Sequence, residues 1–427
     1  MTLADILPSL RSSLPAHLEP GAWPPAARWG GRGELLVAGA GLAALAEAHG
    51  TPLYVLDEAA VRERCRAYAA AFGAENVAYT GKALLTAGVA GWVAAEGLGL
   101  YAGSAGEIRV ALAGGVDPSR IVLYGSAKTP EDLAVARAAG VGAIVVESLS
   151  EITRLAATAP AGQRVLLRLL AGPAEGEAFG LRVGTGEAAT AVARIAGQPG
   201  LRLAGLDCSV GHEIERFQRY ETELRRIAEF SAHIHRAHGA AVGWVDLGGG
   251  HTDHDFALEA FAGRMRAMMT LESERRGVPA PRLGVSPGRA VVGRAGVTVY
   301  RILSVTARRD GRLLVATDGG MTDCPAAQCA DRHTAVLVGR ASVAPPVPAT
   351  VLGRHNDPGD FVVPRLELPA DVHPGDLLAV AGTGAYHHAR ASNFHLVPHP
   401  ALLAVSAGRA RTLLRRESID DLLAREC

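Results

Sequence analysis

The sequence predicts an α/β protein in which a parallel (β/α)8 barrel is followed by a second, all-β C-terminal domain. From Thr51 onward, short apolar runs alternate with amphipathic segments rich in Ala, Glu and Arg, which is the pattern of repeated βα units. Beyond about Gly293 the chain changes to Val- and Leu-rich segments broken by Gly, Pro and Asp, as is typical of antiparallel strands. A length of 427 residues accommodates a barrel and a smaller companion.

Residues 1–50 form an N-terminal segment that we expect to join the β domain. The segment is rich in Pro and Gly, with one short apolar run over residues 34–38 that predicts a strand. The pattern after this run predicts a helix over residues 42–49.

Residues 51–290 form the predicted barrel. Its strand candidates are short and almost continuously apolar, as expected for parallel strands buried on both faces. In chain order they read PLYVLD, NVAYT, LGLYAG, RIVLYGS, AIVVES, RVLLRLL, LAGLDCSVG, GWVDLGGG and RLGVSPG. Functional groups in such barrels gather at the C-terminal ends of the strands, so we expect the site there.

Residues 291–427 form the predicted β domain. The strand candidates are VTVYRILSVTAR, GRLLVATDGG, TAVLVG, GDLLAVAGTGAY and HLVPHPALLAVSAG. The last segment, SIDDLLARE, predicts a short final helix because Ser418 can serve as the N-cap of an acidic first turn.

Composition favours a small-molecule enzyme in the cytoplasm. The 43 basic and 43 acidic side chains cancel, which gives no reason to expect a nucleic acid or an anionic membrane as partner. The opening MTLADILPSL lacks the features of a secretory signal, and no apolar run is long enough to cross a membrane. The five cysteines show no CxxC spacing. The spacing of His251, His254 and Asp255 suggests metal ligands, but no HxxxH-type helix or third ligand is evident, so we predict no metal.

Lys82 is the first candidate for catalysis. It lies in AYTGKALL, just beyond an apolar run, which places it near the C-terminal mouth of an early barrel strand. A buried lysine there can lose its proton and form a Schiff base with an aldehyde cofactor. Taken alone, the residue fits an ordinary surface lysine better, and the glycine-rich strand ends further along the chain favour the cofactor role.

Three glycine-rich segments are candidates for binding a phosphate. Gly249 and Gly250 follow the strand WVDL, while Gly288 and Arg289 belong to VSPGRA. Glycines at strand ends let backbone N–H groups approach a phosphate, and an arginine adds a charge-assisted fork. Tyr386, in GTGAY of the β domain, is a further candidate contact.

Taken together, these segments resemble the diaminopimelate/ornithine decarboxylase family, fold type III of the pyridoxal-phosphate enzymes. The motifs are AYTGKALL, GLGLYAGSAGE, the GGG and SPGR strand ends, ATDGGM, RHNDPGD, PGDLLAVAGTGAY and ASNF, in the family's order from about residue 51 to 424. The resemblance implies pyridoxal 5'-phosphate bound to Lys82. It also implies a head-to-tail homodimer in which each site borrows residues from the partner's β domain. The implied cofactor contacts are Gly249, Gly250, Gly288, Arg289 and Tyr386.

The sequence departs from the family at the cofactor ring. In DCSVGH, Ser209 takes the position of the ring-stacking histidine and His212 that of the phosphate-binding serine. In SPGR, Ser286 replaces the glutamate that keeps the pyridine nitrogen protonated. A neutral hydroxyl stabilises that charge less than a carboxylate does, so we expect a weaker electron sink.

Further departures fall in the β domain. The family's loop with a proton-donating cysteine becomes Asn356-Asp357, the two residues that occupy its catalytic position, and Asn356 has no usable proton. Ala326 and Ala330 stand where an arginine and a tyrosine meet the substrate's distal carboxylate in the family. Replacement proton donors include His355, Cys324 and one of the adjacent His387 and His388.

These patterns predict a pyridoxal-phosphate-dependent decarboxylase that acts at Cα of an amino acid or amino-acid derivative through a Lys82 Schiff base. The departures lead us to expect a substrate other than diaminopimelate. Two alternatives stay open: an amino-acid racemase or epimerase, which Ser286 favours slightly, and a homologue that binds the cofactor without catalysis.

Overall fold

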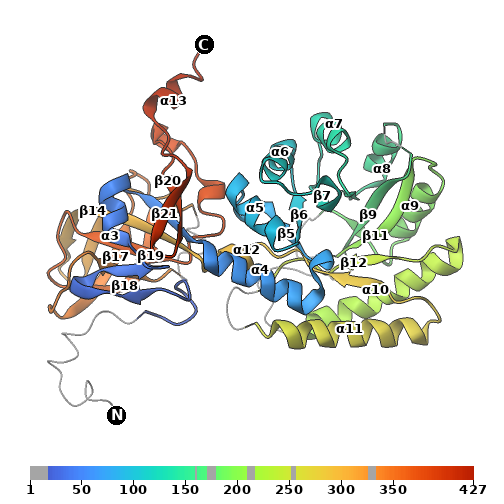
Figure 1. Ribbon diagram of the computed structural model, residues 1–427, viewed down its shortest axis with the longest axis horizontal. Coiled ribbons are helices and arrows are strands. Elements are labelled where there is room, and N and C mark those ends of the chain that lie inside the picture. Colours follow the sequence, from blue (N-terminus) through green and yellow to red (C-terminus); the bar gives the residue numbers. More distant parts are fainter. Residues whose placement is uncertain (1–17, 159–160, 171–178, 209–216, 252–255, 326–332) are drawn as a thin grey trace. The chain divides into compact units, whose positions relative to one another are not determined.

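The computed structural model describes residues 18–158, 161–170, 179–208, 217–251, 256–325 and 333–427. The chain divides into two compact units (Figure 1). One, called the barrel unit here, is Arg62–Val291; the other, called the β unit, combines Met1–Val61 with Val292–Cys427. Among the described residues, no helix has both the length and the apolar character that a membrane crossing requires.

The barrel unit contains a parallel sheet that is closed by a bridge between Val77 and Val285. The strands follow one another in chain order around the sheet, which confirms the predicted (β/α)8 barrel. They are β5 (Ala78–Thr80), β6 (Gly99–Ala102), β7 (Ile121–Leu123), β8 (Ala143–Val146), β9 (Gln163–Leu170), β11 (Leu201–Asp207), β12 (Trp244–Asp246) and β13 (Arg282–Gly284), with the short β10 (Leu181–Arg182) beside β9.

Helices alternate with these strands and pack around them (Figure 1). They are α5 (Ala87–Ala95), α6 (Ala105–Ala113), α7 (Pro130–Ala139), α8 (Leu149–Ala156), α9 (Glu187–Ala196), α10 (Phe217–His238) and α11 (Leu258–Arg275). Four of them begin at a hydroxyl N-cap whose oxygen accepts a backbone N–H of the first turn. These caps are Thr86, Ser104, Thr129 and Ser148. Two further helices, α4 (Glu58–Phe72) and α12 (Arg289–Val292), contain the boundaries between the units.

The β unit is built on a sheet with the strand order β18-β17-β15-β14-β4-β20-β21, in which β19 also pairs with β14, and β16 pairs with β19. The predicted C-terminal strands are confirmed as β14 (Gly296–Ala307), β15 (Leu313–Thr317), β16 (Ala335–Val338), β19 (Leu377–Ala381) and β20 (Ala401–Ser406). The sequence did not reveal β17 (Pro346–Leu352), β18 (Phe361–Pro369) or β21 (Arg409–Leu414). Prolines interrupt the apolar alternation of β17 and β18, which hides the strand pattern.

One of the predicted barrel strands lies in the β unit instead. PLYVLD forms β4 (Leu53–Asp57), which pairs with β14 and β20 in the β unit and is not a barrel strand. All five of its residues are buried. A continuously apolar run is typical of any strand covered on both faces, so it does not separate a barrel strand from a central strand of this sheet. Because β20 pairs with β4 in parallel, and β17 with β15, the unit is not purely antiparallel.

The ends of the chain follow the predictions. The N-terminal segment forms β1 (Arg28–Trp29), β2 (Leu35–Val37), β3 (Ala40–Gly41) and α3 (Leu42–His49), and its apolar side chains pack in the core of the β unit. The final helix, α13 (Ile419–Leu423), begins with a capping box at Ser418.

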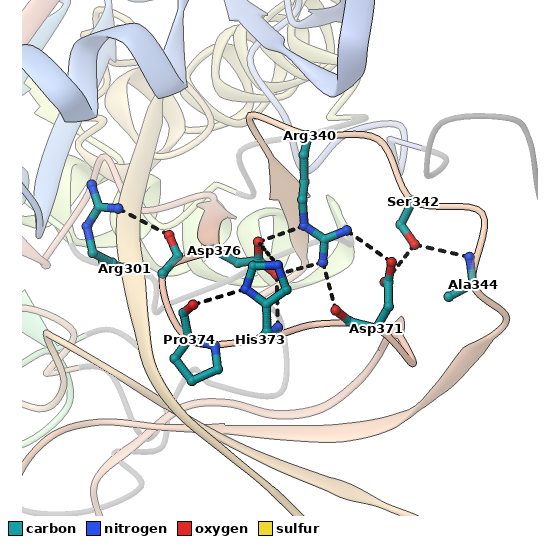
Figure 2. Close-up of polar contacts among 9 residues, drawn as sticks. Arg301, Arg340, Ser342, Ala344, Asp371, His373, Pro374 and Asp376 are labelled. Carbon is teal, nitrogen blue, oxygen red and sulfur yellow. Dashed lines mark hydrogen bonds and ion pairs between the residues drawn. The ribbon is translucent and has the colours of Figure 1, made fainter.

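Arg340 joins two loops of the β unit through a polar network (Figure 2). Its guanidinium makes two parallel hydrogen bonds of 2.7 Å to the carboxylate of Asp376, which is only 4% exposed. It also donates to the side chain and the carbonyl of Asp371, which in turn accepts from Ser342. This bidentate, partly buried pair fixes the loop before β19.

Candidate active site

Lys82 lies in the turn that follows β5, at the C-terminal mouth of the barrel. It is exposed in the single chain, yet enough protein surrounds its amine that burial lowers the pKa of Lys82. The Arg168 guanidinium lowers this pKa further, while Glu107 and Asp207 act in the opposite direction. A larger share of neutral amine makes Lys82 a better nucleophile toward an aldehyde.

Lys82 is also one of only two lysines in the sequence. The other, Lys128, is buried, and its amine donates to Glu151 Oε1 at 2.8 Å and to the carbonyl of Gly125 at 2.7 Å. An amine held in this way is not available for imine formation, so Lys82 is the lysine suited to hold a carbonyl cofactor.

The glycine-rich strand ends meet beside the Lys82 turn. A Cβ on Gly249 would lie 1.8 Å from the carbonyl oxygen of Ser286, and one on Gly288 would lie 3.1 Å from the Ala83 side chain. The hydroxyl of Thr80 at the end of β5 donates to that same Ser286 carbonyl at 2.7 Å. The ends of β5, β12 and β13 are therefore packed so closely that only glycine fits at Gly249.

The remaining predicted phosphate contacts in the barrel unit are close in the chain to this cluster. Gly250 follows Gly249 and is half-buried, and Arg289 is the first residue of α12, directly after Gly288. Ser209 and His212 lie outside the described residues, as do Ala326 and Ala330.

Asp246, the last residue of β12, is a site residue that the sequence analysis missed. It is fully buried, and its Oδ1 accepts hydrogen bonds from Gly248 N at 2.7 Å and from the Ser286 hydroxyl at 2.9 Å. Its Oδ2 has no hydrogen-bond partner among the described residues. Burial raises the pKa of Asp246 to about 7, the nearby Asp207 adds to this, and the bond from Ser286 opposes it. An acidic residue inside the apolar run GWVDL was the signal that could have identified it.

A second carboxylate is held by an ion pair at the same end of the barrel. Arg168, on β9, donates to Asp207 at the end of β11 with an N–O distance of 2.6 Å. The Tyr101 side chain of β6 is buried nearby, and burial raises its pKa, with Asp246 and Asp207 contributing. The mouth thus brings carboxylates, the Arg168 guanidinium and the Lys82 amine close together.

Asn356, Asp357 and Tyr386 belong to the β unit. Asn356 and Asp357 are exposed in the turn before β18, where Asp357 accepts the backbone N–H of Gly359 at 2.8 Å. Tyr386 is half-buried and has a φ of +62°, a left-handed conformation that costs a non-glycine residue about 1–2 kcal/mol. Backbone strain of this kind is concentrated at ligand contacts and active sites, so it supports a functional reading of Tyr386.

The alternative proton donors also lie in the β unit. His355 is buried, its Nε2 is 3.1 Å from the Thr322 hydroxyl, and burial lowers its pKa. Burial lowers the pKa of His388 to about 4, so its ring is neutral at pH 7. His387 is buried with its Nδ1 3.0 Å from the Ala385 carbonyl, while Cys324 Sγ lies 3.9 Å from His333.

His251, considered as a metal ligand on its sequence spacing, packs in an aromatic cluster of the barrel unit. Its Nδ1 is 3.1 Å from the Tyr68 hydroxyl, and its ring stacks on Tyr68 and Tyr220. Burial lowers its pKa to about 3. This contact set is that of a packed core histidine; His254 and Asp255 lie outside the described residues.

A parallel barrel with a lysine of lowered pKa at its mouth and close-packed glycine strand ends is typical of the pyridoxal-phosphate barrel class. Residues 58–293 match the family model described as "Pyridoxal-dependent decarboxylase, pyridoxal binding domain". The chain is 44% identical to a diaminopimelate decarboxylase of Actinosynnema pretiosum subsp. auranticum, with 100% of both chains covered. It is 40% identical to that of Mycobacterium tuberculosis, with 96% of this chain and 98% of the relative covered.

Solved structures agree on the fold. Diaminopimelate decarboxylase of M. jannaschii in complex with L-lysine has a TM-score of 0.87 at 24% identity, covering 95% of this chain and 98% of that one. The enzyme of Helicobacter pylori, also with L-lysine, has a TM-score of 0.80 at 21% identity, covering 90% and 98%. The chain belongs to the pyridoxal-dependent decarboxylase family and is a pyridoxal-phosphate-dependent carboxy-lyase. The names of the relatives give no support to the expectation of a different substrate.

The residues of the barrel mouth fit pyridoxal 5'-phosphate. Lys82 offers an amine of lowered pKa for the aldehyde, and the lack of space for a Cβ at Gly249 keeps that strand end as bare backbone, whose N–H groups can donate to a phosphate. The second oxygen of Asp246 is a buried acceptor without a partner among the described residues, so a donor on a ligand would satisfy it.

Proposed function

We propose that this enzyme decarboxylates diaminopimelate, a diamino dicarboxylic acid, at one of its α-carbons. The observation that carries the proposal is the similarity to enzymes of that name over the whole length of the chain. The departures at Ser209, Ser286 and Asn356 then concern how the chemistry is supported, and Asp246 supplies a physical reason why one of them is tolerated.

In this proposal the cofactor, when bound, accepts the electron pair that stays behind as the α-carboxylate leaves as carbon dioxide. Lys82 would hold the cofactor through its aldehyde carbon, and the lowered pKa of Lys82 increases the share of neutral amine that can form this bond. The side chain of Glu107, fixed by the N–H of Gly103 at 2.7 Å, lies close enough to Lys82 to influence its pKa. Glu107 can therefore favour the return of a proton to that amine.

Ser286 and Asp246 together take over the role of the family's glutamate in our proposal. The Ser286 hydroxyl donates a hydrogen bond to Asp246. The lone pairs of the hydroxyl oxygen therefore remain available to accept a hydrogen bond from a protonated ring nitrogen. The negative charge of Asp246 stands one hydrogen bond away and increases the basicity of that oxygen. A carboxyl whose pKa is about 7 ionises readily when a cation binds beside it.

The proposal also gives roles to residues of the β unit. We propose that Tyr386 contacts the cofactor, that Asn356 and Asp357 face the substrate, and that the enzyme is a head-to-tail homodimer, as in the family it resembles. The strained backbone of Tyr386 supports the first of these roles. We also propose a cytoplasmic location, because Cys65, Cys208, Cys324 and Cys427 are free thiols.

The proposal is tested with purified enzyme, added cofactor and an amino-acid panel that contains the diaminopimelate stereoisomers, lysine, ornithine and arginine. Carbon dioxide release and product chirality are measured for each. We expect gas and lysine from diaminopimelate alone. Release of carbon dioxide from another amino acid would identify that amino acid as the substrate and contradict the proposal. Inversion without carbon dioxide release would indicate a racemase, and cofactor binding without turnover would indicate a non-catalytic homologue.

The bond between the cofactor and Lys82 is tested separately on the same purified enzyme. Borohydride reduction followed by peptide mass spectrometry should place the cofactor on Lys82. The Lys82→Arg variant should lose the visible absorption of the bound cofactor, whereas Lys128→Arg, the matched control, should keep it. Label on Lys128, or absorption that survives in Lys82→Arg, contradicts the assignment.

A further inference from the structure

Three potential metal ligands that have no role in the proposed reaction meet in the β unit. One ligand atom from each of Cys324, His333 and His387 lies within 4.8 Å of the other two. Cys324 Sγ and His333 Nδ1 are 3.9 Å apart, and the rings of His333 and His387 are separated by 4.9 Å between centroids.

The fold brings these residues together by strand pairing. His333 precedes β16 and His387 follows β19, and these two strands are antiparallel neighbours. The N–H of Ala381 donates to the carbonyl of Thr334 at 3.0 Å, so the start of β16 and the end of β19 lie at the same end of the ladder. Cys324 belongs to the turn after β15 that Gly320 closes by accepting the N–H of Asp323 at 3.0 Å. The cluster therefore rests on three ordered backbone segments.

The burial and tautomer of these side chains suit a metal. Cys324 and His387 are each only 1% exposed, and His333 is half-buried. His387 Nδ1 lies 3.0 Å from the Ala385 carbonyl, which can only accept, so this nitrogen carries the proton and Nε2 carries the ring's lone pair. Metal-binding histidines are commonly oriented by a hydrogen bond of this kind from the other ring nitrogen to a carbonyl.

We propose that Cys324, His333 and His387 bind zinc. One thiolate and two imidazoles form a ligand set that zinc prefers, and three protein ligands leave a fourth position for water. Tetrahedral zinc with ordinary bond lengths sets sulfur and nitrogen about 3.5 Å apart, so the 3.9 Å between Cys324 and His333 needs only a small side-chain rotation. The three ligands do not form a short sequence motif, because the strands β16 to β19 separate His387 from Cys324 and His333 in the sequence.

The test uses the full-length enzyme with zinc and cobalt as probes. After purification with zinc and extensive dialysis, elemental analysis should find close to one zinc per chain. Replacement by cobalt should give tetrahedral d–d absorption and a near-ultraviolet band from thiolate-to-cobalt charge transfer. The Cys324→Ser variant should lose the charge-transfer band, and His387→Gln should weaken zinc binding by more than about tenfold.

Matched controls separate coordination from damage to the fold. Cys427→Ser removes an exposed thiol and His373→Gln an exposed imidazole, and both should retain the metal and its spectrum. His333→Gln changes a half-buried side chain and provides a second ligand variant with less risk to the core. Substoichiometric zinc in the wild-type chain overturns the proposal, and so does a charge-transfer band that persists in correctly folded Cys324→Ser protein.

Discussion

Replacing Ser286 with alanine tests the electrostatics of the barrel mouth directly. The change removes the 2.9 Å hydrogen bond that the Ser286 hydroxyl donates to the buried carboxylate of Asp246. A hydrogen bond to a charged group contributes about 1.5–3 kcal/mol. Since this bond stabilises only the ionised carboxylate fully, its loss should raise the pH at which Asp246 ionises by about one to two pH units. The wild-type pKa of about 7 therefore moves into the alkaline range.

Carbon-13 NMR of cofactor-free protein labelled at aspartate side chains measures this midpoint. The Asp246→Asn variant identifies the resonance. Ser231→Ala serves as the control, because it removes a buried hydroxyl of α10 that donates to the Ile227 carbonyl at 2.8 Å. An unchanged or lower midpoint in Ser286→Ala would refute the reasoning, since it would mean that Ser286 does not stabilise the ionised form of Asp246.

Three further predictions concern other parts of the molecule. Gly249→Ala should weaken binding of the cofactor at least about tenfold, because its Cβ would meet the Ser286 carbonyl at 1.8 Å; equilibrium dialysis measures this. Arg340→Lys keeps the charge but loses the parallel bonds to Asp376, which should destabilise the β unit by about 2 kcal/mol in calorimetry. Burial raises the pKa of Asp323 to about 7, so the stability it contributes is complete below the pKa of a free aspartate and lost as pH rises through 7. Asp323→Asn should flatten that loss, as thermal melts across this pH range would show.

A specific result would contradict each of these three predictions. Gly263→Ala, in α11, meets nothing within 4 Å, and cofactor affinity equal to that of Gly249→Ala would remove the steric explanation. A melting temperature of Arg340→Lys equal to that of wild type would show that the paired geometry in Figure 2 adds nothing to the charge. A pH profile of Asp323→Asn that parallels wild type would assign the pH dependence to other groups.

The fold was largely predictable because both of its periodic patterns are strong. Parallel barrel strands bury both faces and read as apolar runs, and helices alternate with them, four of which begin at a hydroxyl N-cap. The errors in the predicted fold also arise from these patterns. The β4 run is as apolar as a barrel strand, so only its pairing with β14 reveals its unit. Prolines in β17 and β18 break the pattern that would have marked them.

The candidate site was predictable only where several residues combine into one pattern. A lysine after an early strand and glycine-rich turns after later strands form such a pattern, since few other roles bring them to barrel strand ends. Arg168, Asp207 and Asp246 are not, because a charged residue in a strand has many uses until its partners are known. Their meaning comes from contacts between strands that are adjacent in the barrel and separated by whole helices in the sequence.

Those contacts change how the loss of the family's glutamate is understood. Judged from its position alone, Ser286 makes the cofactor ring a weaker electron sink and favours a racemase. In the structure, Ser286 is bonded to a buried carboxylate that lies on the neighbouring strand. Asp207 is already paired with Arg168, whereas burial raises the pKa of Asp246, so a cationic ligand beside Asp246 would favour its ionised form. Decarboxylation leaves an electron pair that a protonated ring nitrogen would stabilise, and an ionised Asp246 behind Ser286 would help to keep that nitrogen protonated.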